Sequence, residues 1–288
     1  MAKTTVVILH PGEMGAAVAA CALAAGNRVL WTSEGRGADT ARRATAAGLT
    51  DAGSLAAALA SADVVLSVCP PHAAVQVARD VAAQGFRGLY VEGNAVSPAT
   101  SREIARLVES AGATFVDGGI VGGPPPAAVP ASGPATRLYL SGKGAERVSA
   151  LFAGTGLGVV TLDGPVGAAS ALKMSYAAWT KGSTALLAAI CAVAEREGVA
   201  EALFAEWRAS QPELAKRLEG VRGSSRKAWR WIAEMEEIAA TFAGAGLPDG
   251  FHLGAAEVYR RLEGHKDAPK PPALSEITAG LLNPRPPQ

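Results

Sequence analysis

The chain has 288 residues, of which 49 % are hydrophobic and 18 % are charged, and its formal net charge is +1. This length predicts one large domain or two ordinary ones. A near-neutral balance without a basic stripe argues against nucleic acid as a partner. No apolar stretch is expected to reach the ~18 residues that a membrane span needs. No signal peptide precedes the first strand, so we expect a cytoplasmic protein without a membrane anchor.

The three cysteines and four histidines are scattered along the chain. This scatter argues against a disulfide framework, and no pair of histidines has the spacing of metal ligands. Each cysteine lies in an apolar run, which is typical of a buried free thiol. We therefore expect no metal site and no disulfide.

The first half of the chain alternates short apolar runs with helical stretches. Strands are expected at 4–9, 28–31, 63–68, 88–91 and 114–116, and helices at 14–25, 39–47, 72–83 and 98–111. Two more strands, at 137–141 and 158–162, flank a helix at 145–152. This alternation predicts an α/β fold with a doubly wound parallel sheet of Rossmann type.

After Gly164 and Pro165 the pattern becomes helical throughout. A long Ala- and Leu-rich helix is expected over 167–197, and further helices follow to about residue 262. We place the domain boundary near residue 163, with a dinucleotide-binding domain over 1–162 and an all-helical domain over 163–288. The proline-rich tail from residue 268 is expected to be mostly irregular.

The first strand runs into a glycine-containing turn and then into a helix. The turn consists of His10, Pro11, Gly12, Glu13, Met14 and Gly15. It matches the dinucleotide-binding pattern G-x-G-x-x-G with its first glycine replaced by His10. Gly12 allows the backbone to approach a pyrophosphate, Gly15 allows the helix to lie close to the strand, and the helix N-terminus favours anions. An ordinary tight turn between a strand and a helix is the alternative.

The end of the second strand bears on the choice of coenzyme. An acidic residue here holds the ribose hydroxyls of NAD, whereas an arginine accommodates the 2′-phosphate of NADP. Thr32, Ser33 and Arg36 follow this strand and favour NADP. Glu34 lies among them and leaves NAD open.

An ordered series of motifs resembles the β-hydroxyacid dehydrogenase and 6-phosphogluconate dehydrogenase superfamily, over nearly the whole chain. Its closest likeness is to a poorly characterised branch with its own C-terminal domain. After the turn at 10–15, the series continues with Cys69 and Pro70 in Val-Cys-Pro-Pro, with Asn94 in Glu-Gly-Asn, with Asp-Gly-Gly-Ile-Val-Gly-Gly over 117–123, and with Gly-x-x-x-x-x-Lys ending at Lys173.

The resemblance implies roles for these residues. Cys69, Pro70 and Asn94 are expected near the nicotinamide and its ribose, and Gly122 and Gly123 beside the substrate. Val121 stands where the family has a substrate-binding serine, which argues against ordinary carboxylate recognition. Ala177 replaces a family asparagine.

Tyr176, on nearly the same helical face as Lys173, is a candidate replacement for that asparagine. The resemblance also implies that the long helix helps to build a homodimer. His252 is a candidate substrate contact, although a structural histidine is the alternative, and Lys181 is expected to be an exposed charge.

Lys173 suits carbonyl chemistry because hydride transfer to a carbonyl leaves charge on oxygen, which an ammonium stabilises and protonates. We therefore expect an NADP- or NAD-dependent oxidoreductase that interconverts a small hydroxy acid or alcohol and its carbonyl compound, with Lys173 as general acid and base and with Asn94 and Tyr176 beside it. One alternative is imine reduction, although imine reductases usually carry another residue at the position of Lys173. Another is a non-catalytic dinucleotide-binding protein.

Overall fold

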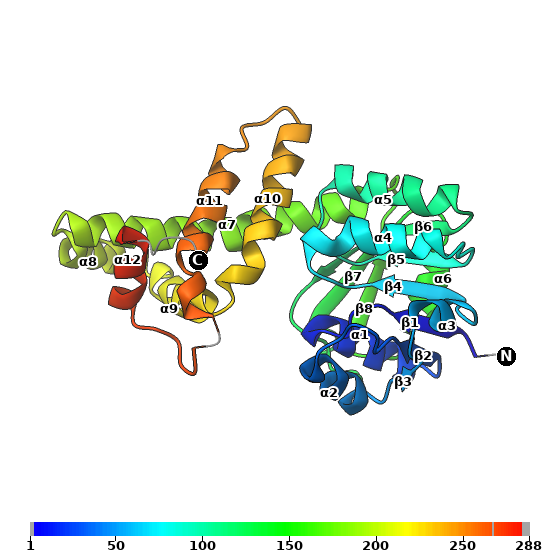
Figure 1. Ribbon diagram of the computed structural model, residues 1–288. Helices are drawn as coiled ribbons and strands as arrows, with labels where there is room; N and C mark the ends of the chain where they lie inside the picture. The colour runs from blue at the N-terminus through cyan, green and yellow to red at the C-terminus, as the bar shows by residue number, and fades with distance from the viewer. Residues whose placement is uncertain (1–2, 267, 284–288) are drawn as a thin grey trace. The chain divides into compact units, whose positions relative to one another are not determined.

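The computed structural model describes residues 3–266 and 268–283 (Figure 1). The chain divides after Met174 into two compact units, which we call the sheet unit and the helical unit. The division falls inside a helix, later than the boundary expected near residue 163. The first turns of that helix belong with the sheet because a buried carboxylate, Asp117, binds the backbone of Gly167 and Ser170.

Eight strands of the described chain form one sheet, in the order β3-β2-β1-β4-β5-β6-β7-β8. The strands are β1 (Thr5–Ile8), β2 (Arg28–Trp31), β3 (Thr50–Asp51), β4 (Val64–Ser67), β5 (Leu89–Glu92), β6 (Thr114–Val121), β7 (Thr136–Ser141) and β8 (Leu157–Thr161). All neighbours are parallel except β6 and β7, which pair antiparallel. The predicted Rossmann-type parallel sheet is confirmed for β1 to β6, and β7 and β8 extend it in the opposite direction.

Helices cover both faces of this sheet (Figure 1). They are α1 (Glu13–Ala24), α2 (Ala38–Ala46), α3 (Leu55–Leu59), η1 (Pro71–Ala73), α4 (Ala74–Ala83), α5 (Pro98–Ser110) and α6 (Ala145–Ala150). Because side chains alternate along a strand, Val6 and Ile8 pack in the core cluster of α1 and α6. Val7 packs on the opposite face, in the core cluster of α4 and α5. Two separate cores therefore hold the sheet from either side.

The helical unit contains the longest helix and the chain that follows it. Its elements are α7 (Ala168–Arg196), which begins in the sheet unit, and α8 (Ala200–Ser210), α9 (Leu214–Ser225), α10 (Ala228–Gly244), α11 (Gly250–Arg261), η2 (Glu263–His265) and α12 (Leu274–Leu282). The all-helical second domain is thus confirmed. The expectation of an irregular tail was wrong for α12, which forms because Ile277 and Leu281, four residues apart, are both buried. The tail beyond residue 283 lies outside the described residues.

A buried ion pair lies within the helical unit. Lys181 of α7 pairs with Glu234 of α10, and both side chains are largely shielded from solvent. Tyr259 of α11 donates a hydrogen bond to the backbone carbonyl of Lys181 at 2.6 Å and packs edge-on against Trp231. The prediction that Lys181 is an exposed charge was therefore wrong, because α10 and α11 fold over it.

α7 is long and apolar enough, by length and composition, to cross a membrane. The expectation that no stretch of the chain reaches this limit was wrong for α7. One such helix is weak evidence for a span, because the core helix of a soluble protein passes the same test.

Candidate functional site

The carboxyl ends of β1, β4, β5 and β6 lie at one edge of the sheet unit, because these strands are parallel neighbours. Segments that the sequence singled out follow each of these strands. In open α/β sheets, ligands bind at this edge.

The turn after β1 has the shape that a dinucleotide requires. A Cβ on Gly15 would lie 2.2 Å from the backbone carbonyl oxygen of His10, so only glycine lets α1 start so close to β1. A Cβ on Gly12 would meet nothing within 4 Å, which leaves the backbone open to a ligand. Gly12 is the N-cap of α1 and has no side chain that could cap the first turn. The start of the helix therefore suits a negatively charged group such as a pyrophosphate.

Positive side chains surround this turn. Arg43 of α2 donates a hydrogen bond from Nε to the backbone carbonyl of Pro11 at 3.3 Å. Burial and the nearby charge of Arg36 lower the pKa of His10 to about 4. His10 is therefore neutral near pH 7, and the two guanidinium groups supply the positive charge. The sequence singled out Arg36 but missed Arg43, since nothing in the pattern of α2 separates it from Arg42.

The residues after β2 meet an acidic neighbour. Asp51 accepts a hydrogen bond from the backbone N–H of Ser33 at 3.2 Å. Hydrogen bonds from the Ser33 side chain and from the backbone of Gly53 hold the pKa of Asp51 below its usual range. Thr32 is buried, whereas Arg36 is exposed. Of the predicted 2′-phosphate ligands, Arg36 is the one whose side chain is open to solvent and lies near the turn.

Asn94 holds together the loops that follow β4 and β5. Its side-chain oxygen accepts a hydrogen bond from the backbone N–H of Cys69, and its amide nitrogen donates to Ser67 Oγ at 3.1 Å. Cys69 is half-buried rather than fully buried as expected, and burial raises the pKa of its thiol to about 12. Pro70, the next residue, is exposed and precedes η1. Asn94 thus shapes the loop that carries Cys69 and Pro70.

Glu92 is a buried acid at the end of β5. Its side chain is fully buried, and Oε1 accepts the backbone N–H of Asn94 at 3.0 Å. Burial raises the pKa of Glu92 to about 8, and the negative charge of Asp117 on β6 acts in the same direction. The carboxyl group is therefore mostly protonated at neutral pH.

Three of the glycines of β6 and the segment after it are required by packing. A Cβ on Gly118 would lie 2.7 Å from the carbonyl oxygen of Glu92, and one on Gly119 would lie 2.9 Å from Cβ of Lys173. Gly122 has a φ of +122°, and a Cβ there would lie 2.7 Å from Thr136 Oγ1. Gly123, in contrast, faces open space, so it fits the predicted role beside a substrate.

Val121 and Lys173 are the other site residues of this region. Val121 is buried at the end of β6 and offers no hydroxyl group. Lys173 is half-buried on the first turns of α7, directly against Gly119. The sheet unit thus brings Lys173 to the strand that carries Val121, at the same edge as the glycine turn.

Two predicted residues lie in the helical unit. Tyr176 is half-exposed on α7. His252 of α11 is buried, its ring lies 4.5 Å from that of Phe242, and a Cβ on Gly182 would lie 3.3 Å from its Cε1. Burial lowers the pKa of His252. Close packing within its own unit is the environment of a structural histidine.

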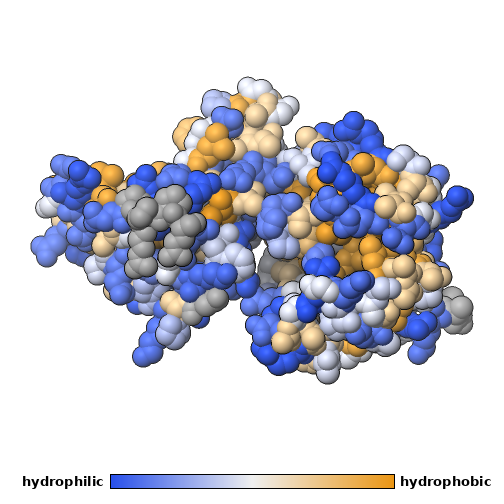
Figure 2. Space-filling model, in the orientation of Figure 1, coloured by the Kyte–Doolittle hydropathy of each residue, from blue (hydrophilic) through white to orange (hydrophobic). Residues whose placement is uncertain are grey.

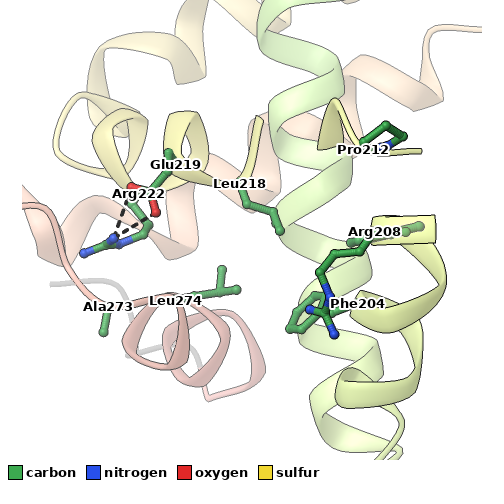
Figure 3. Close-up of a pocket in the computed structure, with 9 residues that line it drawn as sticks. Phe204, Arg208, Pro212, Leu218, Glu219, Arg222, Ala273 and Leu274 are labelled. Carbon is green, nitrogen blue, oxygen red and sulfur yellow. Dashed lines mark hydrogen bonds and ion pairs between the residues drawn. The ribbon is translucent and has the colours of Figure 1, made fainter. Parts of the chain in front are cut away.

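A cavity of about 550 Å³ lies in the helical unit, between α8, α9 and α12 (Figure 3). It is lined by apolar side chains that include Phe204, Trp207 and Leu274, with Arg208 and Arg222 beside them. Arg222 pairs with Glu219. None of the residues predicted from the sequence lines this cavity.

Family models match both units of the chain. The NAD-binding domain of 6-phosphogluconate dehydrogenase matches residues 7–136, and DUF1932, a domain of unknown function, matches residues 194–262. An uncharacterized 28.5 kDa protein from Methanothermus fervidus is 28 % identical over 183 residues, which are 62 % of this chain and 68 % of that protein.

Solved structures resemble the chain over most of its length. A conserved protein of unknown function, MTH1747, described as similar to 3-hydroxyacid dehydrogenases, is 26 % identical with a TM-score of 0.64, covering 91 % of this chain and 98 % of its own. The 3-hydroxyisobutyrate dehydrogenase of Mycobacterium tuberculosis is 21 % identical with a TM-score of 0.68, covering 97 % and 99 %. At that identity the likeness shows the fold. The resemblance inferred from the motifs is confirmed.

Proposed function

We propose that this chain, which joins an NAD-binding domain of the 6-phosphogluconate dehydrogenase type to a DUF1932 domain, is an NADP(H)-dependent oxidoreductase. Its substrate is a small hydroxy acid or alcohol that it interconverts with the carbonyl compound, and Lys173 is the general acid and base. One observation carries the proposal. A single compact unit contains both the glycine turn after β1 and Lys173, at the edge of the sheet where the parallel strands β1 to β6 end.

The glycine turn fits a dinucleotide because Gly12 leaves room and Gly15 brings the start of α1 close. The bound coenzyme supplies or accepts a hydride at its nicotinamide ring. Arg36 and Arg43 near the turn favour the 2′-phosphate of NADP, since guanidinium groups bind phosphate through paired hydrogen bonds. The negative charge of Asp51 beside Ser33 opposes binding of a 2′-phosphate, but the two arginines carry more positive charge than this one carboxylate offsets.

Lys173 completes the chemistry. In the reducing direction its ammonium group donates a proton to the carbonyl oxygen as negative charge develops there. In the oxidising direction the neutral amine takes the proton of the substrate hydroxyl group. Asn94 keeps the loop of Cys69 and Pro70 in shape, and Tyr176 lies one turn beyond Lys173. Val121 lacks the hydroxyl group of the family serine, which favours a substrate with an apolar group at that position.

The proposal includes a homodimer built on α7. Tyr176, Trp179, Leu186 and Val193 are large apolar residues on this helix, each between 50 and 64 % exposed. The last three repeat every seven residues, which is the spacing of a helix seam that faces a partner. Figure 2 shows further apolar surface at the tip of α10 and α11, where Phe251 is 80 % exposed. Leu186→Glu should convert a dimer into a monomer in light scattering after size exclusion.

Coenzyme binding and turnover test the function. NADPH and NADH are titrated against the protein by fluorescence, and small hydroxy acids, alcohols and carbonyl compounds are then assayed with the preferred coenzyme. Lys173→Met should keep its affinity for NADPH and lose turnover by about 10²- to 10⁴-fold. Lys143→Ala, at an exposed lysine of the sheet unit, is the matched control and should behave as wild type.

Each remaining result points to another function. Turnover that is retained in Lys173→Met would remove Lys173 from its assigned role. Reduction of cyclic imines but not of carbonyl compounds would identify an imine reductase. Tight NADPH binding without turnover of any compound tested would favour a dinucleotide-binding protein, and failure to bind either coenzyme would refute the proposal.

A further inference from the structure

Asp117, at the centre of β6, is a buried carboxylate with an unusual number of hydrogen-bond donors. Oδ1 accepts from Ser101 Oγ at 2.8 Å and from Ser170 Oγ at 2.6 Å. Oδ2 accepts from Ser141 Oγ and from the backbone N–H groups of Gly167 and Ser170, each at 3.0 Å. These five donors compensate for the water that the fully buried side chain has lost.

Three of these bonds hold the start of α7. The first N–H groups of a helix have no acceptor within the helix, and a negative group there is also favoured by the helix dipole. α7 begins at Ala168, and its opening turn is capped from the sheet: Asp117 accepts from Gly167 and Ser170, and Ser141 Oγ accepts from Ala169 at 3.2 Å. The usual cap, a polar residue just before the helix, is thus supplied by β6 and β7.

Gly119 brings the same turn against β6. Residues 117 and 119 point to the same face of the strand because side chains alternate. A Cβ on Gly119 would lie 2.7 Å from the carbonyl oxygen of Ala169 and 2.9 Å from Cβ of Lys173. β6 therefore contacts α7 at Lys173, and Asp117 holds the N-terminal start of the helix about one turn before Lys173.

We propose that Asp117 is a positioning residue for the reaction: by holding the first turn of α7 on β6, it sets the place of the Lys173 amine relative to the ligand-binding edge of the sheet. The inference rests on the proposed function, in which Lys173 transfers the proton. Misplacement of a reacting group by about 1 Å can reduce rates about 100-fold, so a helix end that shifts by that amount has a measurable consequence.

The experiment compares three variants in the full-length protein. Asp117→Asn keeps the shape of the side chain but replaces one accepting oxygen by an amide NH₂, which faces other donors. Ser170→Ala removes one bond to α7 and leaves both backbone bonds to Asp117. Ser101→Ala is the matched control, because it removes a donor to the same carboxylate from α5 without touching α7.

Three quantities are measured for each variant: kcat, the Kd for NADPH, and the pKa of the Lys173 amine from the NMR signal of ¹³C-methylated lysine. The Lys173 signal is assigned by its absence in Lys173→Met. We expect kcat of Asp117→Asn to fall about 10- to 100-fold, with a shifted lysine pKa and an unchanged Kd, because the glycine turn lies on β1. Ser170→Ala should show a smaller change in the same direction, and Ser101→Ala none in the lysine signal.

An unchanged kcat and lysine signal in Asp117→Asn would overturn the inference. Equal effects of Ser101→Ala and Ser170→Ala would also overturn it, because they would show general destabilisation. If Asp117→Asn does not fold, the comparison of Ser170→Ala with Ser101→Ala decides alone. If the wild-type protein shows no turnover, the proposed function fails, and the lysine signal still tests whether Asp117 positions Lys173.

Discussion

Replacing Glu92 by glutamine tests the description of the buried acid at the end of β5. The pKa of Glu92 rises from 4.5 to about 8 on folding, chiefly through burial. The folded protein therefore binds a proton that the unfolded chain releases between these values, and stability falls as pH rises from about 4.5 to about 8. At about 1.4 kcal/mol for each pH unit, this loss reaches about 5 kcal/mol at most above pH 8.

Glu92→Gln stays neutral at every pH and does not have this loss. At pH 5 the variant should match the wild type or be less stable by about 1–3 kcal/mol, since the new amide hydrogens need acceptors. Between pH 5 and pH 9 its stability should improve relative to the wild type by about 3–5 kcal/mol, measured by urea unfolding followed by circular dichroism. Glu103→Gln, at an exposed partner of Arg79, is the control and should change stability by less than about 1 kcal/mol. A difference between Glu92→Gln and wild type that is equal at both pH values would refute the reasoning.

The glycine turn, its arginine and the buried ion pair give three more predictions. Gly15→Ala should lower the melting temperature and abolish NADPH binding, because its Cβ would lie 2.2 Å from a backbone oxygen, whereas Gly12→Ala should weaken binding and keep the melting temperature. Equal melting temperatures of Gly15→Ala and Gly12→Ala would contradict the close contact at Gly15. Arg43→Ala should weaken NADPH about tenfold in fluorescence titration and weaken NADH less, because Arg43 also holds the Pro11 carbonyl of the turn that both coenzymes share; an equal loss for both coenzymes would count against a 2′-phosphate contact. Lys181→Met should destabilise the protein by about 3–5 kcal/mol in urea unfolding by leaving Glu234 buried without its cation, and Lys181→Met with Glu234→Leu should recover most of that loss. A double variant as unstable as the single one would show that the ion pair is not the cause.

The elements that the sequence predicted are those with a strong local signal. β1, β2, β4 and β5 are continuous apolar runs, and the predicted ends of β2 match the structure. β3 and α3 were missed because two exposed residues and a five-residue helix give almost no periodicity. β6 was predicted to end at residue 116, since Gly118 and Gly119 suggest a turn. In the structure these glycines continue the strand and let it contact its neighbours closely.

The residues of the candidate site, like the helices and strands, were predicted where the signal is local in the sequence. Gly15 was identified because its role depends on a strand and a helix that adjoin in sequence. Asp117 was quoted only as part of a motif, because its partners at 167 and 170 lie about 50 residues away and no spacing relates them. Arg43 and Lys181 were missed for the same reason: the contacts that distinguish them from surface charges are made by segments distant in sequence. Gly122 was assigned to substrate, and that role stays a prediction; its positive φ and the 2.7 Å between a Cβ there and Thr136 Oγ1 add a packing requirement that the sequence did not predict.

The register of β5 and β6 brings the two buried acids of the sheet unit opposite each other, Glu92 beside Asp117. A second negative charge in this interior would need donors of its own. Five donors converge on Asp117, whereas Glu92 accepts the backbone N–H of Asn94 and interacts with the side chains of Asn94 and Ser67. Glu92 is the acid of this pair whose pKa is raised, chiefly by burial, while Asp117 caps α7. Burial is the larger cause of the neutrality of Glu92, and the negative charge of Asp117, the residue that caps α7, adds to it across the paired strands.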